Sequence, residues 1–396
     1  MKIFVLNCGS SSFKYQLIDM VNETALAKGL VERIGMNGAQ ITHETEKNGK
    51  VKMQHDIPNH KVAVQLAFEA LTHAEHGVIS DIKEIGACGH RVVHGGEKFS
   101  SAAVVTDEVR KAISDCAALA PLHNPANLTG IEACEAILNV PQVVVFDTAF
   151  HQTMPEKAFM YALPYELYEK YKVRRYGFHG TSHKFVSDRA AKLLGKPISE
   201  LKLISCHLGN GASVAAIKGG KCVDTSMGLT PLEGLIMGTR TGDMDPAAVT
   251  FVMEKEGLTP TQMDDLMNKK SGALGVSGKS SDFRDLEEGR AAGDKRCDLA
   301  LSMYAYRVAK YIGAYAAAMN GVDGIIFTAG VGENGADTRL EVCEYLTYLG
   351  VSMDKEKNSK RGIEHDVSIA DATTRVMVIP TNEELVIARA ALELVK

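Results

Sequence analysis

The chain has 396 residues, enough for two hydrophobic cores, and its formal net charge is −5 at pH 7. This charge gives no reason to expect nucleic-acid or membrane binding, and no run of about 18 apolar residues predicts a transmembrane helix. The eight cysteines show no C-x-x-C pair and no disulfide spacing, and the N-terminus lacks the pattern of a signal peptide. We therefore expect free, mostly buried thiols and a cytoplasmic protein.

An apolar run, a Gly/Ser turn and a second apolar run occupy residues 1–19, which predicts a β-hairpin. The turn, Asn7-Cys8-Gly9-Ser10-Ser11-Ser12-Phe13-Lys14, combines close backbone approach at glycine with hydroxyl groups and a lysine charge. These groups suit phosphate, although a merely polar hairpin tip is the alternative. Residues 203–217 repeat the pattern around Gly209-Asn210-Gly211. Two such hairpins half a chain apart suggest two related domains with a nucleotide between them.

Strand and helix signals alternate along the chain, which predicts an α/β protein. The clearest strands are Ile3–Leu6, Val143–Phe146, Leu203–Cys206, Gly324–Thr328 and Arg375–Ile379. The clearest helices are Lys61–His73, Thr129–Leu138, His183–Leu194, Cys297–Asn320 and Asp337–Tyr348. Residues 35–58 are expected to form hairpin and loop, and residues 269–290 a surface excursion with helical pieces. A domain boundary is expected near Phe150.

Two motifs in the N-terminal half carry candidate chemistry. His90-Arg91-Val92-Val93-His94-Gly95-Gly96 sets an arginine among histidines and glycines, where it could clamp a carboxylate or phosphate with two parallel hydrogen bonds. An arginine that only stabilises a turn is the alternative. Asp147 follows a buried apolar run, and acids at strand ends commonly face the ligand crevice of an α/β fold. Asp147 could hold Mg²⁺, contact the nucleophile or simply cap the turn.

Two further motifs suit phosphoryl transfer. His179 and His183 are four residues apart, as in some zinc sites, but Gly180 stands where the metalloprotease motif needs glutamate. His179 on a loop between Phe178 and Gly180 better suits a hydrogen-bond donor to a transferring phosphoryl group. Arg240 lies in a polar loop with glycine on either side, and arginine is the usual stabiliser of the charge that such a transfer develops. A purely structural role remains the alternative for both.

The segment from Phe327 to Gly335 contains G-x-G-x-x-G between a strand and a helix, so a dinucleotide site is one interpretation. Its position near the C-terminus, the distance of about 40 residues to the next strand and the two unexplained glycine turns favour an adenosine or phosphate loop instead. Glu383 and Glu384 follow the last strand and could be magnesium ligands or first-turn acids of a helix. No G-x-x-x-x-G-K-[ST] motif is present, so this is not a P-loop enzyme.

Taken in order, these motifs resemble those of the acetate kinase family, within the superfamily of acetate and sugar kinases, heat-shock ATPases and actin. Residues 7–14 and 89–96 are similar to its two signature segments, and the resemblance covers essentially the whole chain. It implies two duplicated ribonuclease-H-like (actin-like ATPase) domains, residues 1–149 with 384–396 and residues 150–383, with the nucleotide in the cleft between them. It also implies a homodimer and a reversible, direct in-line phosphoryl transfer from ATP to acetate. The implied cofactor is Mg²⁺, which Mn²⁺ can replace.

The resemblance further implies roles for individual residues. Asn7 and Glu383 match its magnesium positions, and Arg91 matches the acetate-binding arginine. His179 and Arg240 match the transition-state stabilisers, and Asp147 an acid assigned as proton donor or acceptor. The methyl pocket is implied at Val93, Leu122 and Pro231. Nucleotide contacts are implied at Ser12, Lys14, His207, Leu208, Gly209, Asn210, Gly211, Asp282, Phe283, Arg284, Gly330, Val331, Gly332, Glu333 and Asn334.

A carboxylate substrate with a pKa of about 4–5 is ionised at pH 7 and needs no general base. We therefore expect Asp147 to organise Mg²⁺ or Arg91. Propionate kinase is the nearest alternative, because one methylene changes specificity by only about 1–3 kcal/mol; butyrate kinase is more distant. A non-metabolic ATPase of this fold is a third interpretation, although such a protein needs no carboxylate clamp at Arg91.

Overall fold

The computed structural model describes residues 1–121 and 123–396. The chain forms two compact units. Unit 1 comprises residues 1–152 and 382–396, and unit 2 comprises residues 153–381.

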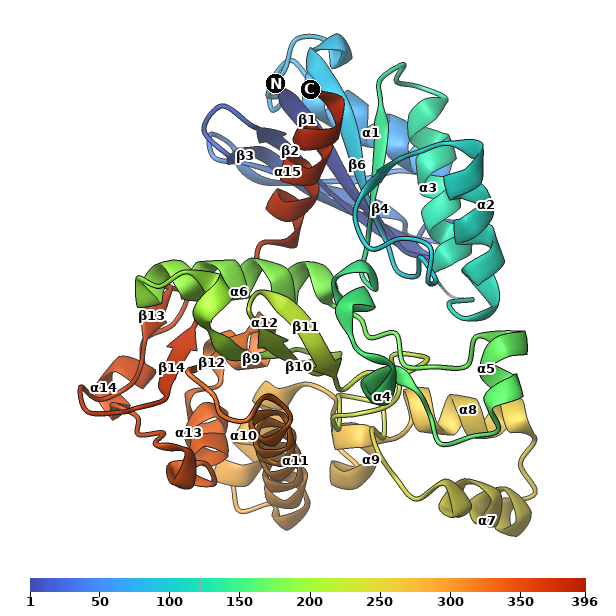
Figure 1. The fold of residues 1–396 in the computed structure, drawn as a ribbon. Coiled ribbons are helices and arrows are strands. Elements are labelled where there is room, and N and C mark those ends of the chain that lie inside the picture. Colours follow the sequence, from blue (N-terminus) through green and yellow to red (C-terminus); the bar gives the residue numbers. More distant parts are fainter. Residues whose placement is uncertain (122) are drawn as a thin grey trace. The chain divides into compact units, whose positions relative to one another are not determined.

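Unit 1 is built on an eight-stranded sheet with the order β5-β4-β3-β2-β1-β6-β8-β7 (Figure 1). Strands β1 to β5 pair antiparallel in sequence order, whereas β6 and β8 run parallel to β1. The strands are β1 (Lys2–Cys8), β2 (Ser12–Asp19), β3 (Thr24–Glu32), β4 (Gln40–Thr45), β5 (Gly49–Gln54), β6 (Ile85–Val92), β7 (Ala103–Val104) and β8 (Gln142–Phe146).

Helices cover both faces of this sheet. The helices α1 (His60–Thr72), α2 (Asp107–Asp115) and α3 (Asn124–Glu135) lie on one side, and α15 (Glu383–Val395) packs on β1, β6 and β8 from the other (Figure 1). Close approach is built into the sequence at Gly89 of β6, where a Cβ would lie 2.6 Å from Cγ2 of Ile387. The C-terminal helix can therefore sit tightly on the strand that leads to Arg91.

Unit 2 is built on a six-stranded sheet with the order β11-β10-β9-β12-β14-β13. Its strands are β9 (Lys202–Leu208), β10 (Ala212–Lys218), β11 (Lys221–Thr225), β12 (Gly324–Thr328), β13 (His365–Asp366) and β14 (Arg375–Val378). Helices α6 (Gly180–Leu194) and α11 (Lys295–Met319) lie on opposite faces of the sheet (Figure 1). The other helices are α4 (Glu156–Phe159), α5 (Tyr165–Tyr171), α7 (Pro246–Glu256), α8 (Pro260–Lys269), α9 (Gly272–Ser277), α10 (Phe283–Ala291), α12 (Ala329–Asn334), α13 (Ala336–Glu344) and α14 (Lys355–Asn358).

The two sheets share one topology. In each, the first strand pairs with an antiparallel hairpin partner on one side and with a parallel strand on the other, and this parallel strand pairs with a second one. The resulting orders are β3-β2-β1-β6-β8 in unit 1 and β11-β10-β9-β12-β14 in unit 2. The carboxyl ends of β1, β6 and β8 therefore meet at one edge of their sheet, as do those of β9, β12 and β14 in theirs. Such edges are where α/β folds bind ligands.

The sequence prediction of an α/β protein with these strands and helices is confirmed, with shifts at the ends. Helix α3 begins at Asn124 rather than Thr129, because Pro125 fits the first turn, where its missing N–H costs nothing. Helix α13 ends at Glu344, short of the expected Tyr348. The polar segment 35–58 contains the β4–β5 hairpin, as expected.

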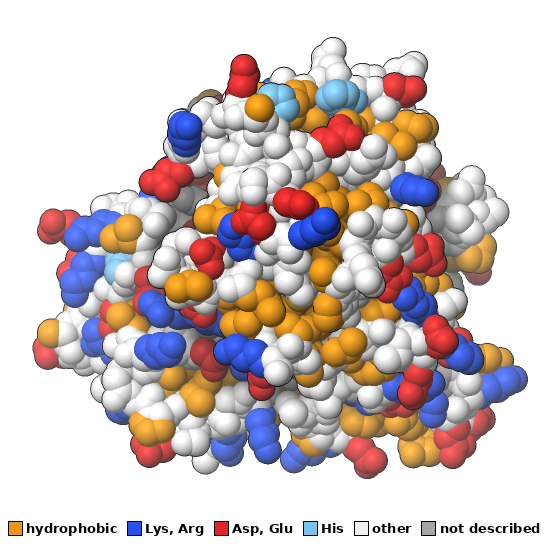
Figure 2. Space-filling view, turned by 90° about the horizontal axis from the view of Figure 1, so that it is seen from above, with side chains coloured by type: hydrophobic (Ala, Val, Ile, Leu, Met, Phe, Trp, Pro, Cys, Tyr) orange, Lys and Arg blue, Asp and Glu red, His pale blue; other side chains and the backbone are white. Residues whose placement is uncertain are grey.

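All eight cysteines are free and buried, as the sequence predicts. In the part of the chain that the structure describes, no helix combines the length and apolar character needed to cross a membrane. Acidic and basic side chains are interspersed with apolar ones on the face shown in Figure 2.

Candidate active site

The two glycine turns predicted from the sequence both follow the first strand of their sheet. In unit 1 the N–H of Gly9 donates to the carbonyl of Ser12 at 2.8 Å, and in unit 2 the N–H of Gly209 donates to Gly211 at 3.1 Å. Lys14 stands opposite Asn7 across the β1–β2 hairpin, so both side chains lie on one face near the turn. Each unit therefore presents backbone and polar groups at the edge where its parallel strands end.

Arg91 and Asp147 form an ion pair at this edge of unit 1. Nε and Nη2 of Arg91 donate to Oδ1 and Oδ2 of Asp147 at 2.9 and 2.7 Å. Asp147 is 1% exposed, while the Arg91 side chain remains 23% exposed. Burial acts to lower the pKa of Arg91, but the charge and hydrogen bonds of Asp147 raise it above its usual value, so the guanidinium is firmly charged. Only two of its five N–H donors go to Asp147, so three remain for other acceptors.

Glu383, the first residue of α15, belongs to the same group of charges. Burial raises the pKa of its carboxyl to about 7; Arg91 opposes this shift, and Asp147 adds to it. Glu384 raises this pKa further, and Lys14 lowers it. Three carboxyl groups thus face two cations, a balance that suits an added divalent cation. Leu6 pairs with His90, so Asn7 lies at the strand position next to Arg91. Its side-chain amide oxygen is of the ligand type that Mg²⁺ prefers.

Two buried asparagines of α3 hold the ends of β1 and β6 in place. Asn127 donates to the carbonyl of Cys8 at 2.8 Å and accepts the N–H of Val93 at 3.1 Å. Asn124 bonds both backbone groups of His94 in the same way, at 3.1 and 3.0 Å. Sequence reasoning did not assign these residues, although two amides at helical spacing after a Pro-bounded loop were a usable signal. Val93 is buried, and the predicted pocket residue Leu122 lies outside the described residues.

In unit 2 a chain of hydrogen bonds orients three histidines. Nδ1 of His179 and Nε2 of His183 both bond the hydroxyl of Ser213, at 2.9 and 2.8 Å. The rings of His179 and His207 stack with centroids 4.1 Å apart. His179 precedes α6 with φ at +58°, a left-handed conformation that a side chain other than glycine adopts at a cost. The Ser213 bond thus engages Nδ1 of His179, and Nε2 lies near Gly211, where a Cβ would be 3.6 Å from it.

Arg240 and His179 converge on the second glycine turn. A Cβ built on Gly211 would lie 3.6 Å from both Nη1 of Arg240 and Nε2 of His179. Nη1 of Arg240 also donates to the carbonyl of Pro231 at 3.0 Å, and burial lowers the pKa of its guanidinium. Among the described residues no carboxylate pairs with Arg240. A partly buried cation without a counterion, beside a glycine turn and a histidine, is suited to an anionic ligand.

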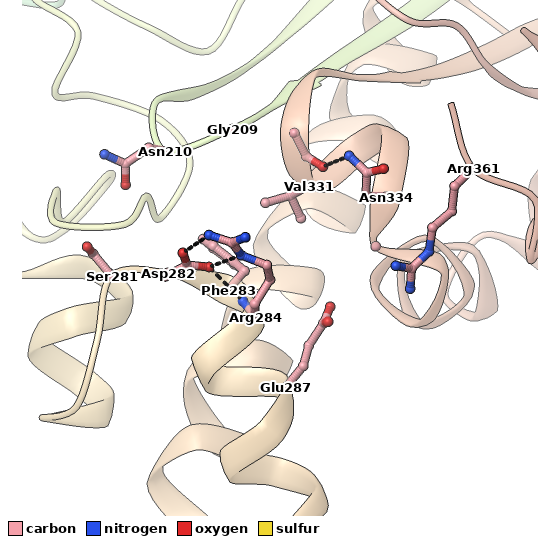
Figure 3. A pocket seen from close by; sticks show the side chains of 12 residues that line it. Gly209, Asn210, Ser281, Asp282, Phe283, Arg284, Glu287, Val331, Asn334 and Arg361 are labelled. Atoms are coloured by element: carbon pink, nitrogen blue, oxygen red, sulfur yellow. Dashed lines mark hydrogen bonds and ion pairs between the residues drawn. The ribbon is translucent and has the colours of Figure 1, made fainter. Parts of the chain in front are cut away.

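A pocket of about 600 Å³ lies within unit 2 and begins at the same glycine turn (Figure 3). Residues of α10 and α12 line two of its sides. The lining residues are Gly209, Asn210, Ser281, Asp282, Phe283, Arg284, Glu287, Gly330, Val331, Asn334, Gly335 and Arg361. The structure thus brings together most nucleotide-contact positions expected in the second half of the chain. Glu287, whose pKa burial raises, and Arg361 were not anticipated.

The loop after β12 is held in place by hydrogen bonds, and only some of its residues line the pocket. Glu333 accepts the N–H of Ala329 at 2.8 Å and that of Thr381 at 3.2 Å, and Ala329 has a φ of +65°. Arg339 is 0% exposed and donates to the carbonyl of Gly332 and to both oxygens of Asn358, at 2.6–2.8 Å. Burial lowers the pKa of Arg339 to about 10. Gly332 and Glu333, which the sequence placed among the nucleotide contacts, thus help to hold this loop in place and are not among the residues that line the pocket.

Comparisons with known proteins identify the relatives of this chain. The model of the acetokinase family matches residues 2–389. The chain is 60% identical over 396 residues to an acetate kinase of Carboxydothermus hydrogenoformans, covering 100% of this chain and 99% of the relative. It is similar to the crystal structure of Porphyromonas gingivalis acetate kinase, with a TM-score of 0.97, 50% identity and all of both chains covered. It is also similar to a propionate kinase from Francisella tularensis, with a TM-score of 0.93, 41% identity and 99% of each chain covered.

Proposed function

The chain belongs to the acetokinase family, with its two-domain, actin-like α/β fold, and we propose that it transfers the γ-phosphoryl group of ATP reversibly to acetate, giving acetyl phosphate and ADP. The observation that carries this proposal is the convergence of Arg240 and His179 on Gly211, in the same glycine turn as Gly209 and Asn210, which line the unit 2 pocket. A nucleotide held in the pocket would present its phosphates to the glycine turn. The propionate reaction is less favoured, because acetate kinases match this chain at higher identity.

Arg91 is the proposed acetate-binding residue. Its guanidinium keeps three donors after binding Asp147, and a planar fork fits a carboxylate. Val93, which is buried two residues after Arg91, would contact the methyl group. Because acetate is already ionised at pH 7, its oxygen can attack phosphorus without a general base. Asp147 then acts as a positioning residue that keeps Arg91 charged and oriented.

The transfer is proposed to be in line. One acetate oxygen forms a bond to the γ-phosphorus while the bond to the bridging oxygen of ADP breaks, and charge spreads over the three equatorial oxygens. Arg240 and Nε2 of His179, which both lie near Gly211, would donate to those oxygens. For this donation the proton of His179 must lie on Nε2, which the Ser213 hydroxyl allows by donating to Nδ1.

Magnesium would be held by the acidic group of unit 1. Asn7 and Glu383 supply oxygen ligands, and the excess of carboxyl groups around Arg91 fits a divalent cation, with Mn²⁺ as a substitute. When bound, the ion supplies charge neutralisation on the phosphate oxygens of ATP. Lys14, on the hairpin opposite Asn7, would add a positive charge to the same phosphates.

A homodimer is the proposed assembly. On α11 the side chains of Leu299, Met303 and Tyr306 follow one helical face and are exposed, and Tyr345 packs edge-on against Tyr306. A second copy of the chain would cover this apolar face. Light scattering of the purified protein should give twice the chain mass. Tyr306→Lys with Met303→Lys should give the mass of one chain.

The function is tested by trapping acyl phosphate with hydroxylamine. The purified protein is supplied with MgATP and with acetate, propionate or butyrate, and a reaction without acid is the control. Hydroxamate formed from acetate with the highest kcat/KM is the expected result. A higher kcat/KM for propionate would make propionate the preferred substrate and leave the proposed mechanism unchanged. ATP hydrolysis without any hydroxamate would overturn the function.

A further inference from the structure

A tight loop follows α1 in unit 1, away from the residues described above. The N–H of Gly77 donates to the carbonyl of His73 at 2.8 Å, and Val78 donates to Leu71 at 2.8 Å. A Cβ at Gly77 would lie 2.5 Å from the His73 carbonyl oxygen, so only glycine allows this turn. Asn48 also donates to the carbonyl of Glu75 at 3.0 Å. The backbone of residues 73–77 is therefore held in place before any ligand binds.

This loop gathers three side chains with metal-ligating atoms. Each residue offers one ligand atom, and the three atoms, from His73, Glu75 and His76, all lie within 4.8 Å of one another. His73 and Glu75 are exposed, whereas His76 is only 8% exposed. Nε2 of His76 is buried and has no hydrogen-bond partner among the described residues. Buried polar atoms are nearly always satisfied in folded proteins, so this nitrogen calls for a ligand.

We propose that His73, Glu75 and His76 form a binding site for a divalent transition-metal ion with the preferences of Zn²⁺. Two imidazoles and one carboxylate are a common ligand set for zinc, and a water molecule would complete four-coordination. Hard cations such as Mg²⁺ prefer all-oxygen sites, so this loop selects against the ion proposed for catalysis. The site lies on the surface of unit 1 and takes no part in the proposed phosphoryl transfer.

Binding requires one local movement. The rings of His73 and His76 are stacked, with centroids 3.7 Å apart and planes 16° from parallel, so their nitrogen lone pairs do not converge. The exposed His73 ring must turn out of the stack and release the 3.2 Å hydrogen bond that its Nδ1 accepts from Glu75 N–H. Its exposure leaves room for this rotation, and the buried His76 ring stays in place.

His43 holds the backbone of the site in place and is not itself a ligand. Its Nδ1 bonds the hydroxyl of Tyr15 at 2.7 Å, and its Nε2 donates to the carbonyl of His76 at 3.2 Å. Both nitrogens of this buried ring are therefore occupied. The bond to the His76 backbone fixes the loop to β4, which is the kind of outer contact that orients metal ligands.

Titration calorimetry of the full chain with ZnCl₂, with the nucleotide site saturated by MgADP, tests the proposal. We expect one zinc ion per chain and affinity at least about tenfold weaker in His73→Ala and Glu75→Gln, two exposed substitutions that should not affect folding. His55→Ala, which removes an exposed histidine of the same unit, should bind zinc like the unaltered protein. Zinc should also raise the Tm of the unaltered protein and not that of His73→Ala.

Two results would overturn the site. One is the absence of zinc binding by the unaltered chain under these conditions. The other is an unchanged affinity in both His73→Ala and Glu75→Gln, which would place the bound zinc elsewhere. Hydroxamate formation by the His73→Ala protein should equal that of the unaltered chain, and this result separates the zinc site from the proposed kinase function.

Discussion

Both carboxylate oxygens of Asp147 accept hydrogen bonds from the Arg91 guanidinium, at 2.9 and 2.7 Å. A carboxylate used in this way has its best acceptor positions occupied and faces an arginine that stays charged. This arrangement suits orientation of Arg91 better than removal of a proton from a substrate that has none to lose at pH 7. It gives a structural reason for the positioning role proposed for Asp147.

Asp147→Asn should therefore act mainly on acetate binding. The amide cannot accept both guanidinium bonds, so we expect the acetate KM to rise about tenfold and stability to fall by up to about 3 kcal/mol. Steady-state kinetics across pH 6–9 is the measurement. The shape of the kcat–pH profile should be the same in both proteins. Loss of an ionisation from that profile, with an unchanged acetate KM, would instead identify Asp147 as a base.

Arg240→Ala should have the opposite kinetic signature. Arg240 converges with His179 on Gly211 and is proposed to contact the phosphoryl group mainly in the transition state. We expect kcat to fall about 10³-fold with little change in the acetate KM. Arg189→Ala is the matched control, because Arg189 pairs with Glu364 elsewhere in unit 2. A large rise in the acetate KM at nearly normal kcat would contradict the role given to Arg240.

Much of the site could be anticipated because strand ends and glycine turns leave clear marks in a sequence. The apolar runs before Asn7, Asp147 and Gly209 identified the strands, and parallel pairing then brings their ends to one edge of each sheet. The local sequence pattern is therefore sufficient to predict these strands and where they end. The repeated hairpins also predicted two related domains, and the two matching strand orders confirm this; the actin-like fold itself was implied by the family resemblance.

The supporting contacts could not be anticipated, because they depend on residues distant in sequence. Arg339 reads as an ordinary helical cation, yet it is fully buried and bonds Gly332 and Asn358. Asn127 reaches Cys8 across 119 residues. Arg361 reaches the pocket from a loop without regular structure. Local sequence does not identify the partners of these residues, since tertiary packing determines them.

A network around Glu233 should influence the reaction through Arg240. Glu233 bonds Nη2 of Arg175 at 2.5 Å and the hydroxyl of Tyr161, and Nη1 of Arg175 bonds the carbonyls of Thr225 and Ser226. The loop held in this way includes Pro231, whose carbonyl accepts from Arg240. We expect Glu233→Ala to lower kcat and to leave Arg175 buried without its counterion.

Tyr161→Phe provides the graded comparison. It removes two hydrogen bonds, the one that the Tyr161 hydroxyl donates to Glu233 and the one that it accepts from the N–H of Leu229 at 2.9 Å, and leaves the ion pair. The loss of stability should be about 1–3 kcal/mol and the loss of kcat small. Thermal unfolding and steady-state kinetics of both variants measure the two effects together. A Glu233→Ala protein that loses stability but keeps the kcat of the unaltered chain would show that the network is structural only.

His90 should make unit 1 sensitive to acid. Its ring is 1% exposed, and Nε2 bonds Oε1 of Gln142 at 2.7 Å. Burial lowers its pKa from 6.5 to about 4; Gln142 and Glu135 oppose this shift, and Arg110 adds to it. Between pH 6.5 and 4 the unfolded chain binds a proton at His90 that the folded chain does not, so stability falls as the pH falls through this range. The full loss is about 3 kcal/mol.

His90→Gln should remove this component of the acid response. The glutamine can keep a hydrogen bond to Gln142 but cannot take up a proton. Between pH 6.5 and 4 the free energy of unfolding should therefore fall by about 3 kcal/mol less in His90→Gln than in the unaltered protein. Urea unfolding at several pH values measures how steeply the free energy of unfolding depends on pH in each protein. His55→Gln, which replaces an exposed histidine, should show the same pH dependence as the unaltered protein. Equal slopes in His90→Gln and the unaltered protein would mean that His90 is protonated in the folded state as readily as in the unfolded one.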